Sequence, residues 1–477
     1  MNLHTNVNPI HETFIEGNTV DGFLIGKRIH EGGMADIFSA SKFDLDESII
    51  LKVPKVGPNQ PIESFIGFET EQNILSALSS PFVPTVLGSS DITENPYLAI
   101  QRIAGQSLQS LMNLGKVFDV NEVVSIGIQL STALDSIHQS GVIHHDLKPD
   151  NIIIDEHFKL WLIDFGLAHH RFLPDLLTEQ GQKGIGSAPY VSPEAIFGIR
   201  NDLRSDLFSA GVILYELLTG ILPFEETHSL KGLKKRLWEI PIPPRKIRPE
   251  TPAWLQEIIL TSLEPKAINR LQSASQLRHF LKFPDSVYLT ERSKRTQPSP
   301  LKEQIYKYFK NIGYQPSFTP DKPSRHASIH SILVALETEE MNAEEFIFLA
   351  NSVNDTLKSH AQARVICISA LTHLNEEVET SEIDSHSGQI RAHLAQLKNW
   401  SSNLDCPPER VTCHVVMTQD PANKIIDFAL SNEVNLIIIG ASKIVRSIVP
   451  GKKSTMSQIV ENSPCSVLVA KQLNSVI

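Results

Sequence analysis

The sequence predicts two folded domains of different class: an α+β domain with a small sheet-rich lobe and a larger helical lobe, then an α/β domain with a doubly wound parallel sheet. Three observations support this prediction. The chain has 477 residues, more than a single hydrophobic core usually organises. Its 41% hydrophobic and 20% charged residues are typical of globular proteins. A stretch rich in Pro, Ser and charge separates two regions with different hydrophobic patterns.

The first domain is expected from about Asp21 to Asp285. Short β-branched and aromatic runs come first there, and helical periodicities such as SIGIQLSTALDSIH and DLFSAGVILYELLTG follow. Residues 1–20 are polar and aperiodic, which predicts a flexible extension. Residues 286–323 are expected to form a linker with one short helix at Lys302–Asn311.

The second domain is expected over residues 324–477. Its short apolar runs SILVALE, ARVICIS, RVTCHVVM, NLIIIGA and CSVLVAK are separated by amphipathic stretches. Buried parallel strands with crossover helices have this pattern, which predicts the doubly wound sheet.

Charge and cysteine usage exclude several functional classes. The formal net charge of -11 argues against a general nucleic-acid binder, because phosphate backbones select for clustered Lys and Arg. The 4 cysteines lie in the last third without a CxxC spacing, which indicates structural thiols in a reducing compartment. No apolar run is long enough to cross a membrane, and the N-terminus lacks a signal-peptide core. We therefore expect a soluble, cytoplasmic protein.

Two segments near the start of the first domain suit phosphate binding. In IHEGGMADIFSA, after the strand-like FLIGKR, small residues let backbone amides approach a phosphate. The strand IILKV then carries Lys52, whose expected carboxylate partner lies in FETEQNILSAL. The register of that segment favours Glu71 over Glu69, although both fit an ordinary helix surface.

The stretch VIHHDLKPDNIII, followed by LIDFGLA, is the most specific in the chain. With the preceding motifs it resembles the catalytic core of protein kinases, and GGMADIF and SDLFSAG resemble the bacterial family of eukaryotic-type serine/threonine kinases. The resemblance covers about Asp21 to Asp285 and implies a two-lobed protein kinase fold. It also implies ATP and Mg²⁺ as cofactors, and protein substrates with Ser or Thr acceptors.

The resemblance assigns roles to individual residues. It makes Asp146 the catalytic carboxylate and Lys148 the cation near the transferred phosphate. Lys52 then contacts the α and β phosphates, and the metal ligands are Asn151 and Asp164.

The same resemblance gives the residues around the nucleotide. His30 and Ala35 replace the usual first and third glycines of the loop, and the stretch YLAIQRIAGQSL resembles the hinge that receives adenine. The residues expected to bind ATP are Ile29, His30, Glu31, Gly32, Gly33, Met34, Ala35, Ile37, Lys52, Ile100, Gln101, Ile103 and Asp164.

Three further positions match the architecture of the family. Glu194 in GSAPYVSPEAI and Arg270 in EPKAINRLQSASQL fall where the family forms a buried ion pair, and Asp206 falls beneath the catalytic loop. A buried charge is costly unless it is paired, so the presence of both partners is a consistency check.

His145 departs from the family, because an arginine usually precedes the catalytic aspartate. Its absence removes a cation that commonly holds a phosphorylated activation loop, so we expect activity without loop phosphorylation at Thr178. Ser187 stands where the family has a threonine that orders the acceptor site. His145 could act as a pH-sensitive cation or be an ordinary loop histidine. The alternative to catalysis is a pseudokinase scaffold.

The second domain resembles the universal stress protein family from about Ser324, with a flavodoxin-like strand order expected. Its nucleotide loop keeps Gly440 and Ser454. Lys443 and Lys453 replace the later glycines, Gly451 is out of register, and Glu337 stands where Asp is usual; these departures argue against nucleotide binding. A sensing or homodimerising module is expected instead, with recruitment of substrates as the third alternative.

Overall fold

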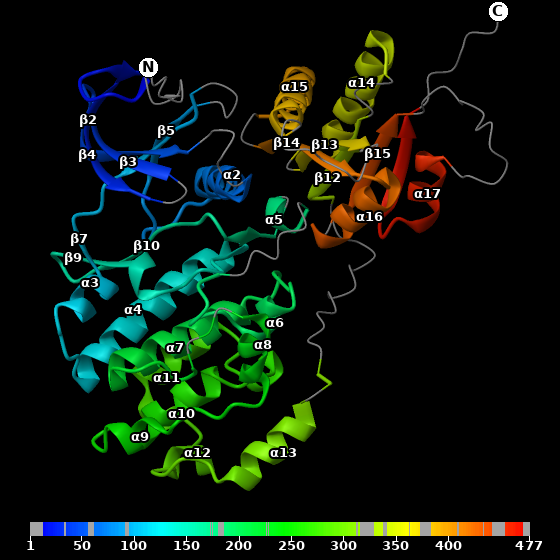
Figure 1. The fold of residues 1–477 in the computed structure, drawn as a ribbon. Coiled ribbons are helices and arrows are strands. Elements are labelled where there is room, and N and C mark those ends of the chain that lie inside the picture. Colours follow the sequence, from blue (N-terminus) through cyan, green and yellow to red (C-terminus); the bar gives the residue numbers. More distant parts are fainter. Residues whose placement is uncertain are drawn as a thin grey trace, which may run out of the picture. The chain divides into compact units, whose positions relative to one another are not determined.

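The computed structural model describes residues 13–470 except 33–34, 56–61, 91–94, 172, 174, 180–185, 226, 228, 312, 315–328, 337–340, 362, 373–382, 408–409, 433 and 441–453. The chain divides into two units, coloured along the sequence in Figure 1. The first comprises Met1–Val56, Pro61–His169 and Gln182–Pro320. The second comprises Gly57–Gln60, His170–Gly181 and Asp321–Ile477, and it includes the short helix α5, Leu176–Glu179.

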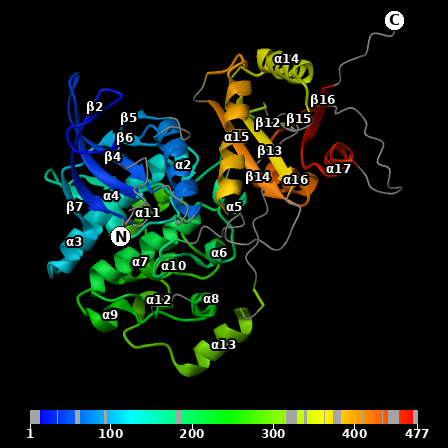
Figure 2. The same ribbon diagram turned by 45° about the horizontal axis from the view of Figure 1, so that its top comes forward.

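The small lobe of the first unit is an antiparallel sheet with the order β1-β2-β3-β4-β6-β5 and one long helix, α2 (Figure 2). Alternating apolar residues of its strands face one core that contains Phe23, Phe38, Leu51 and Tyr97. Phe14 joins this core at 3% exposure, so ordered structure begins before Asp21. The elements are β1 (Thr19–Val20), β2 (Phe23–Glu31), β3 (Ala35–Lys42), β4 (Leu45–Pro54), α2 (Ile62–Ala77), β5 (Val86–Ser89) and β6 (Leu98–Gln101).

The large lobe is mainly helical and is built around α7, which is buried along nearly its whole length. Gly211 of α7 allows close packing, because an added Cβ would lie 2.6 Å from Ser262 Cβ of α10. The elements are β7 (Gly105–Ser107), α3 (Leu108–Asn113), α4 (Val120–Gln139), β8 (Val142–Ile143), η1 (Pro149–Asn151), β9 (Ile152–Asp155), β10 (Leu160–Leu162), β11 (His169–His170), α6 (Pro193–Ile196), α7 (Arg204–Thr219), α8 (Leu230–Leu233), η2 (Lys234–Leu237), α9 (Pro244–Ile247), α10 (Ala253–Ser262), η3 (Ala267–Asn269), α11 (Ala274–Lys282) and η4 (Pro284–Ser286).

Two helices follow the large lobe, α12 (Glu291–Lys294) and α13 (Leu301–Asn311), and both pack against it. The helix expected at 302–311 is present as α13. Buried Gln256 of α10 donates its Nε2 to the carbonyl oxygens of Arg292 (2.7 Å) and Arg295 (2.9 Å). Asn311 donates to the carbonyl of Leu237 at 2.7 Å, so the first unit continues well beyond Asp285.

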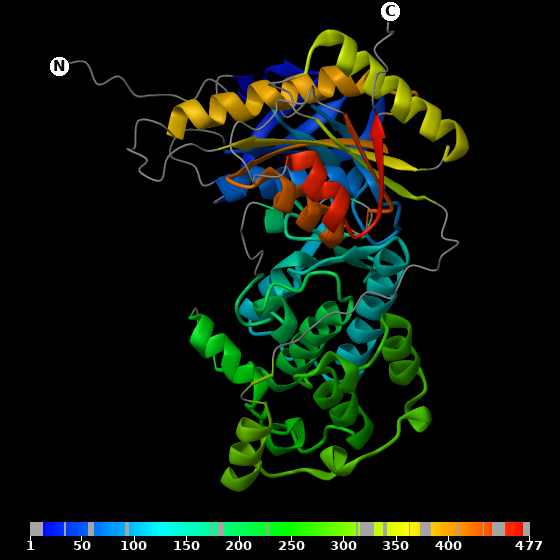
Figure 3. The ribbon, with the colours of Figure 1, turned by 90° about the vertical axis from the view of Figure 1, so that its right-hand side faces the viewer.

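The second unit contains a five-stranded, fully parallel sheet, which confirms the predicted class. Helices α14 and α15 cover one face through Leu349, Val353 and Leu397, and α16 covers the other through Phe428. Figure 3 shows these two helical layers around the sheet. The elements are β12 (Ser331–Ala335), α14 (Ala343–Ser359), β13 (Arg364–Thr372), α15 (Ile383–Ser401), β14 (Val411–Thr418), α16 (Pro421–Ser431), β15 (Leu436–Gly440), α17 (Thr455–Asn462) and β16 (Ser466–Ala470).

The strand order in this sheet corrects one detail of the prediction. The order is β14-β13-β12-β15-β16, which places the first strand of the unit between the second and the fourth. A flavodoxin-like sheet instead has the third strand beside the first, in the order 2-1-3-4-5. Apolar periodicity identifies buried strands but does not encode which strands are neighbours, so the sequence pattern could not decide between the two.

Candidate active site

The loop before β9 is held in place by Asp206, a fully buried residue in the first turn of α7. Its carboxylate accepts hydrogen bonds from the backbone N–H groups of His144 (2.9 Å) and His145 (3.0 Å), and it bonds His138 Nε2 at 2.8 Å. Burial alone would raise the pKa of Asp206, but the bond and charge of His138 lower it to about 2. The carboxylate therefore remains ionised and fixes the loop, with His145 at a φ of 61°.

Asp146 lies at the centre of a group of polar side chains. Its Oδ2 is 3.0 Å from Lys148 Nζ and accepts a hydrogen bond from Asn151 Nδ2 at 3.1 Å. Its Oδ1 accepts the backbone N–H of Ser187 at 2.8 Å, while Lys148 donates to Ser187 Oγ at 3.0 Å. Gly186 permits this approach, since an added Cβ would lie 2.3 Å from the His145 carbonyl oxygen. The structure thus brings the predicted catalytic residues of the large lobe together.

Lys52 of β4 joins the two lobes. It forms an ion pair with Glu71 of α2, and its Nζ is 3.2 Å from Asp164 Oδ1. Burial alone would lower the pKa of Lys52, but the charges of Asp164 and Glu71 raise it overall. The pKa of Asp164 is lowered, chiefly by Lys52. The expected pairing of Lys52 with Glu71 is present, and both acidic partners keep the amine cationic.

The chemistry of Asn151 and Asp164 fits a magnesium ion. The two hydrogen bonds found for the Asn151 side chain both use Nδ2, with Asp146 as the acceptor, so its Oδ1 is oriented as a ligand. Asp164 is ionised, 43% exposed at its side chain and held at a φ of 64°. Carboxylate and amide oxygens are hard ligands of the kind that Mg²⁺ prefers.

The glycine-rich segment is the turn between β2 and β3. Gly32 donates its N–H to the carbonyl of Ala35 at 3.0 Å, and an added Cβ would lie 2.8 Å from that oxygen, so only glycine fits. Ile37 lies opposite Lys52 in the strand register and faces the same side of the sheet. Ile29 is 46% exposed, while Glu31 pairs with Arg28 at 3.1 Å. Gly33 and Met34 lie outside the described residues.

The predicted adenine contacts lie at the end of β6, between the lobes. Ile100 is 7% exposed and Ile103 is partly buried. The backbone N–H of Gln101 donates to the carbonyl of Thr85 at 2.9 Å, so that group is already used within the lobe. Adenine recognition by Gln101 would therefore use its carbonyl oxygen.

His145 is an uncharged structural residue rather than a pH-sensitive cation. Burial lowers its pKa to about 3, with a further contribution from the charge of Arg200. Its Nε2 lies 2.5 Å from the carbonyl oxygen of Arg200. The ring therefore has to donate its Nε2–H to that oxygen.

Arg200 is a residue that sequence reasoning missed. It is 4% exposed, and its guanidinium donates to the carbonyl oxygens of Leu167 (2.8 Å) and Ala168 (3.3 Å), just after Asp164–Gly166. Arg200 also accepts the bond from His145 at its own carbonyl, so it links the segment that follows Asp164 to the loop of Asp146. The only sequence signal was the loss of arginine at position 145.

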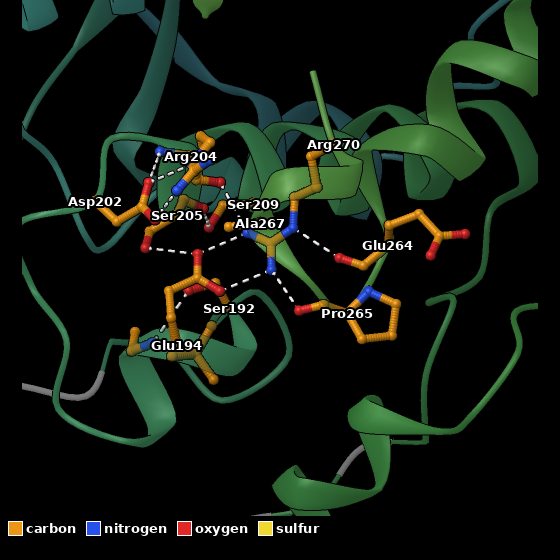
Figure 4. A network of polar contacts seen from close by, with 12 residues as sticks. Ser192, Glu194, Asp202, Arg204, Ser205, Ser209, Glu264, Pro265, Ala267 and Arg270 are labelled. Carbon is orange, nitrogen blue, oxygen red and sulfur yellow. Dashed lines mark hydrogen bonds and ion pairs between the residues drawn. The ribbon is translucent and has the colours of Figure 1, made fainter. Parts of the chain in front are cut away.

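Glu194 and Arg270 form the expected buried ion pair, shown in Figure 4. Two parallel hydrogen bonds of 2.6 Å and 2.7 Å join the guanidinium to the carboxylate. Arg270 also donates to the carbonyls of Glu264 and Pro265, and Ser205 donates to Glu194. Burial alone would raise the pKa of Glu194, but Arg270 lowers it. Both charges are fully compensated, which buried pairs require.

The predicted nucleotide loop of the second unit can be followed only in part. Ser454 caps the N-terminus of α17, where its side chain accepts the N–H of Ser457, and Gly440 ends β15. Glu337, Lys443, Gly451, Lys452 and Lys453 lie outside the described residues, as does the side chain of Thr178 in the first domain. Among the helices that the structure describes, none combines the length and apolar character needed to cross a membrane.

Comparison with known proteins gives the same two-part division. Residues 23–282 match the protein kinase domain, and residues 330–471 match the universal stress protein family.

Three of the similar curated proteins are bacterial kinases. A probable serine/threonine-protein kinase of Clostridium perfringens is 30% identical over 54% of this chain and 38% of its own length. Serine/threonine-protein kinase pkn3 of Myxococcus xanthus is 34% identical over 52% of this chain and 47% of its own length. Serine/threonine-protein kinase PknB of Mycolicibacterium smegmatis is 29% identical over 54% of this chain and 42% of its own length. The matched region spans less than half the length of these relatives. This chain belongs to the protein kinase family and carries a universal stress protein domain after its kinase domain.

Proposed function

We propose that the chain is a serine/threonine protein kinase that transfers the γ-phosphoryl group of ATP, with Mg²⁺, to hydroxyl groups of protein substrates. One observation carries the proposal: Lys52 contacts Glu71 and Asp164 at the same time, which joins the phosphate-binding strand, α2 and the metal-binding segment. Phosphoryl transfer depends mainly on such positioning and charge neutralisation. The names of the relatives support the same activity.

The proposed roles follow from the geometry. Lys52 would bind the α and β phosphates, and Asn151 and Asp164 would hold Mg²⁺, whose charge would neutralise that of the phosphates. Asp146 accepts the proton of the acceptor hydroxyl as it attacks. Lys148 lies 3.0 Å from Asp146 and is placed to stabilise the transferred group.

The direct test compares wild-type phosphate transfer to a protein acceptor with that of Asp146→Asn. We expect kcat to fall about a thousandfold, because the variant loses the carboxylate that accepts the proton. Binding of a non-hydrolysable ATP analogue should be unchanged, which separates catalysis from folding. Failure of the wild-type protein to transfer phosphate with Mg²⁺ or Mn²⁺ would favour a pseudokinase scaffold.

Activity without phosphorylation of the activation loop is part of the proposal. Buried Arg200 already holds the carbonyls of Leu167 and Ala168, and His145 is uncharged, so neither depends on a bound phosphate. Thr178→Ala and phosphatase-treated wild type should therefore retain the untreated kcat. A large loss of kcat in either sample would contradict this proposal.

We propose that residues 324–477 form a regulatory module, in stress signalling, that dimerises through β16. This strand is an edge of the sheet, and Leu468 and Val469 are 39% and 38% exposed. Multi-angle light scattering of the full chain should give a dimer, and Val469→Lys should shift it to a monomer. A monomeric wild type would exclude this role. We propose 21–285 as the bounds of the kinase domain itself; Phe14 before it and the segment with α12 and α13 after it pack against it rather than forming a free extension or linker.

A further inference from the structure

An exposed aromatic side chain marks a surface outside the catalytic cleft. Phe158, in the turn between β9 and β10, is 76% exposed. Its φ of 60° lies in the left-handed region, which costs a residue with a Cβ roughly 1–2 kcal/mol. An exposed phenylalanine in a strained conformation contributes little to folding.

The turn is rigidly built. Asp155 Oδ1 accepts the N–H groups of His157 and Lys159, both at 2.9 Å, and its Oδ2 accepts Trp161 Nε1 at 2.9 Å. Gln129 of α4 donates Nε2 to the Phe158 carbonyl (2.9 Å) and accepts the N–H of Leu160 (3.0 Å). These bonds fix the backbone that carries the ring, so less conformational entropy is lost when the turn binds a partner.

A pocket of about 570 Å³ lies beside this turn and is lined by residues of β7, α3, α4 and β9. Figure 1 shows where these four elements lie. The apolar lining includes Leu111, Phe118, Ile126 and Phe158. The loop that supplies Phe118 also carries Leu114 and Val117, which are 76% and 80% exposed. We call the exposed group Leu114, Val117 and Phe158 the Phe158 patch. Exposed apolar side chains gathered around a pocket are typical of interaction sites.

The polar lining of the pocket is acidic. The lining includes the carboxylates of Glu122, Asp155 and Glu156, with Lys116 as the one cation among the lining residues. The Asp155 carboxylate already accepts three hydrogen bonds within the turn, so it is not free for an occupant. Lys116 is already paired with Glu122 at 3.0 Å. The carboxylate of Glu156 is 78% exposed, and its ion-pair contact within the described part of the chain is the 3.7 Å contact to His157. An occupant with positive charge beside its apolar groups is complementary to this lining.

We propose that this pocket and the Phe158 patch are a docking site for a segment of the protein substrate in which apolar side chains adjoin Lys or Arg. A small molecule inside the pocket would leave the patch exposed, whereas a peptide segment with several apolar side chains covers both. The site lies apart from the acceptor-binding residues but is joined to them by β9, which directly follows Asn151. This inference rests on the proposed kinase function and extends it to substrate selection.

The kinetic test uses two peptides that share the same acceptor sequence around a single phosphorylatable threonine. The long peptide adds a flexible linker and a segment with two arginines and two leucines, and the short peptide lacks both. Docking raises the effective concentration of the acceptor, so we expect KM of the long peptide to be about tenfold lower. Phe158→Asn and Glu156→Lys should abolish this advantage with kcat and KM for the short peptide unchanged. Asn tolerates the left-handed backbone, so the turn is preserved.

Matched controls are Phe43→Asn, which removes a fully exposed phenylalanine elsewhere, and Glu291→Lys, which reverses an exposed carboxylate of α12. Both should behave as wild type. Equal KM values for the two peptides in the wild type, or an unchanged advantage in both pocket variants, would overturn the proposal.

Direct binding separates this inference from the kinase proposal. Fluorescence anisotropy of the dye-labelled arginine–leucine segment, without any acceptor, should show saturable binding to the full chain and to Asp146→Asn. Binding should weaken about tenfold or more in Phe158→Asn, and a leucine-to-serine version of the segment should not bind. Absence of saturable binding to the wild type would overturn the docking site even if phosphate transfer is observed. Binding without phosphate transfer would instead contradict only the kinase proposal.

Discussion

Each unit of the chain contains a buried histidine whose pKa burial lowers to about 3, but the two differ in their partners. His145 in the kinase domain has Nε2 2.5 Å from the carbonyl of Arg200, and its own N–H is held by Asp206. His414 in β14 is 3% exposed, and its Nε2 has no hydrogen-bond partner among the described residues. In the kinase domain the buried histidine therefore joins two loops by hydrogen bonds, whereas in the second domain the Nε2 of the buried histidine bonds to nothing in the described part of the chain.

The contrast indicates that buried polar groups of the kinase domain hold its loops in one arrangement. In the kinase domain, the buried charges of Asp206, Glu194 and Arg270 each have several partners, and the catalytic loop depends on them. A satisfied polar network specifies one arrangement, whereas an unsatisfied group in a sheet lowers stability without specifying anything. Substitutions in the two units should therefore have opposite consequences.

Arg270→Met should produce the largest effect and sharpen the contrast. It leaves the buried carboxylate of Glu194 without its partner, which costs about 3–5 kcal/mol in the free energy of unfolding. Calorimetry should show the kinase-domain transition moved to lower temperature and that of the stress-protein domain unchanged. The double variant Glu194→Gln with Arg270→Met should recover much of the loss. An equal shift of both transitions would mean that the units do not unfold independently.

Arg200→Met tests whether the connection through His145 matters for catalysis. Loss of the charged hydrogen bonds to Leu167 and Ala168 should cost about 2 kcal/mol, or roughly thirtyfold in kcat. Arg278→Met removes a partly buried pair with Asp135 and serves as the control for loss of an arginine, with kcat near wild type. Arg200→Lys should restore part of kcat. A variant of Arg200 that alters thermal stability but not kcat would reduce the residue to a structural role.

The two histidines can be compared directly by His145→Leu and His414→Leu, measured by urea unfolding. His145→Leu should cost about 1–3 kcal/mol, because the Arg200 carbonyl loses its donor. His414→Leu should be neutral or stabilising, since it replaces an unsatisfied polar atom by an apolar side chain. Equal losses of unfolding free energy in the two variants would contradict the proposed difference between the two histidines.

The smallest effect is the pH dependence. A neutral buried histidine has a folded-state pKa below its ordinary value of 6.5, so its contribution to stability is complete above pH 6.5 and is lost as pH falls toward 3. Between pH 6.5 and 5.5, each histidine should lower the free energy of unfolding by about 1 kcal/mol. His414→Leu should make the fall shallower in the stress-protein domain alone. Urea unfolding at a series of pH values measures this slope.

The residues of the candidate active site could be predicted to lie together because the motifs that contain them have a characteristic order and spacing along the chain. Glu71 was distinguished from Glu69 by the register of one helix, and Lys52 does pair with Glu71. Arg200 could not be found this way, since its contact with Leu167 spans 33 residues and depends on the direction of one side chain. The Phe158 patch was hidden for a similar reason, because an exposed phenylalanine has no periodic pattern.

Long-range pairing also limited the prediction of the second domain. Each strand was recognisable from its own apolar run, but β12 pairs with β15 across about a hundred residues. Nothing in the composition of either strand favours that neighbour over another parallel strand.

The bonds from Asp206 have a consequence for when the chain becomes active during its synthesis. The backbone of His144 is held by Asp206, which lies 62 positions later in the chain. Glu194 pairs with Arg270, which lies 76 positions later. Contacts of such sequence separation form late, because the intervening loop must close first. A nascent chain can thus contain all of its small lobe, including Lys52, before the loop of Asp146 has the partners that fix it. Under the proposed function, chain topology alone would delay phosphate transfer until the large lobe is complete.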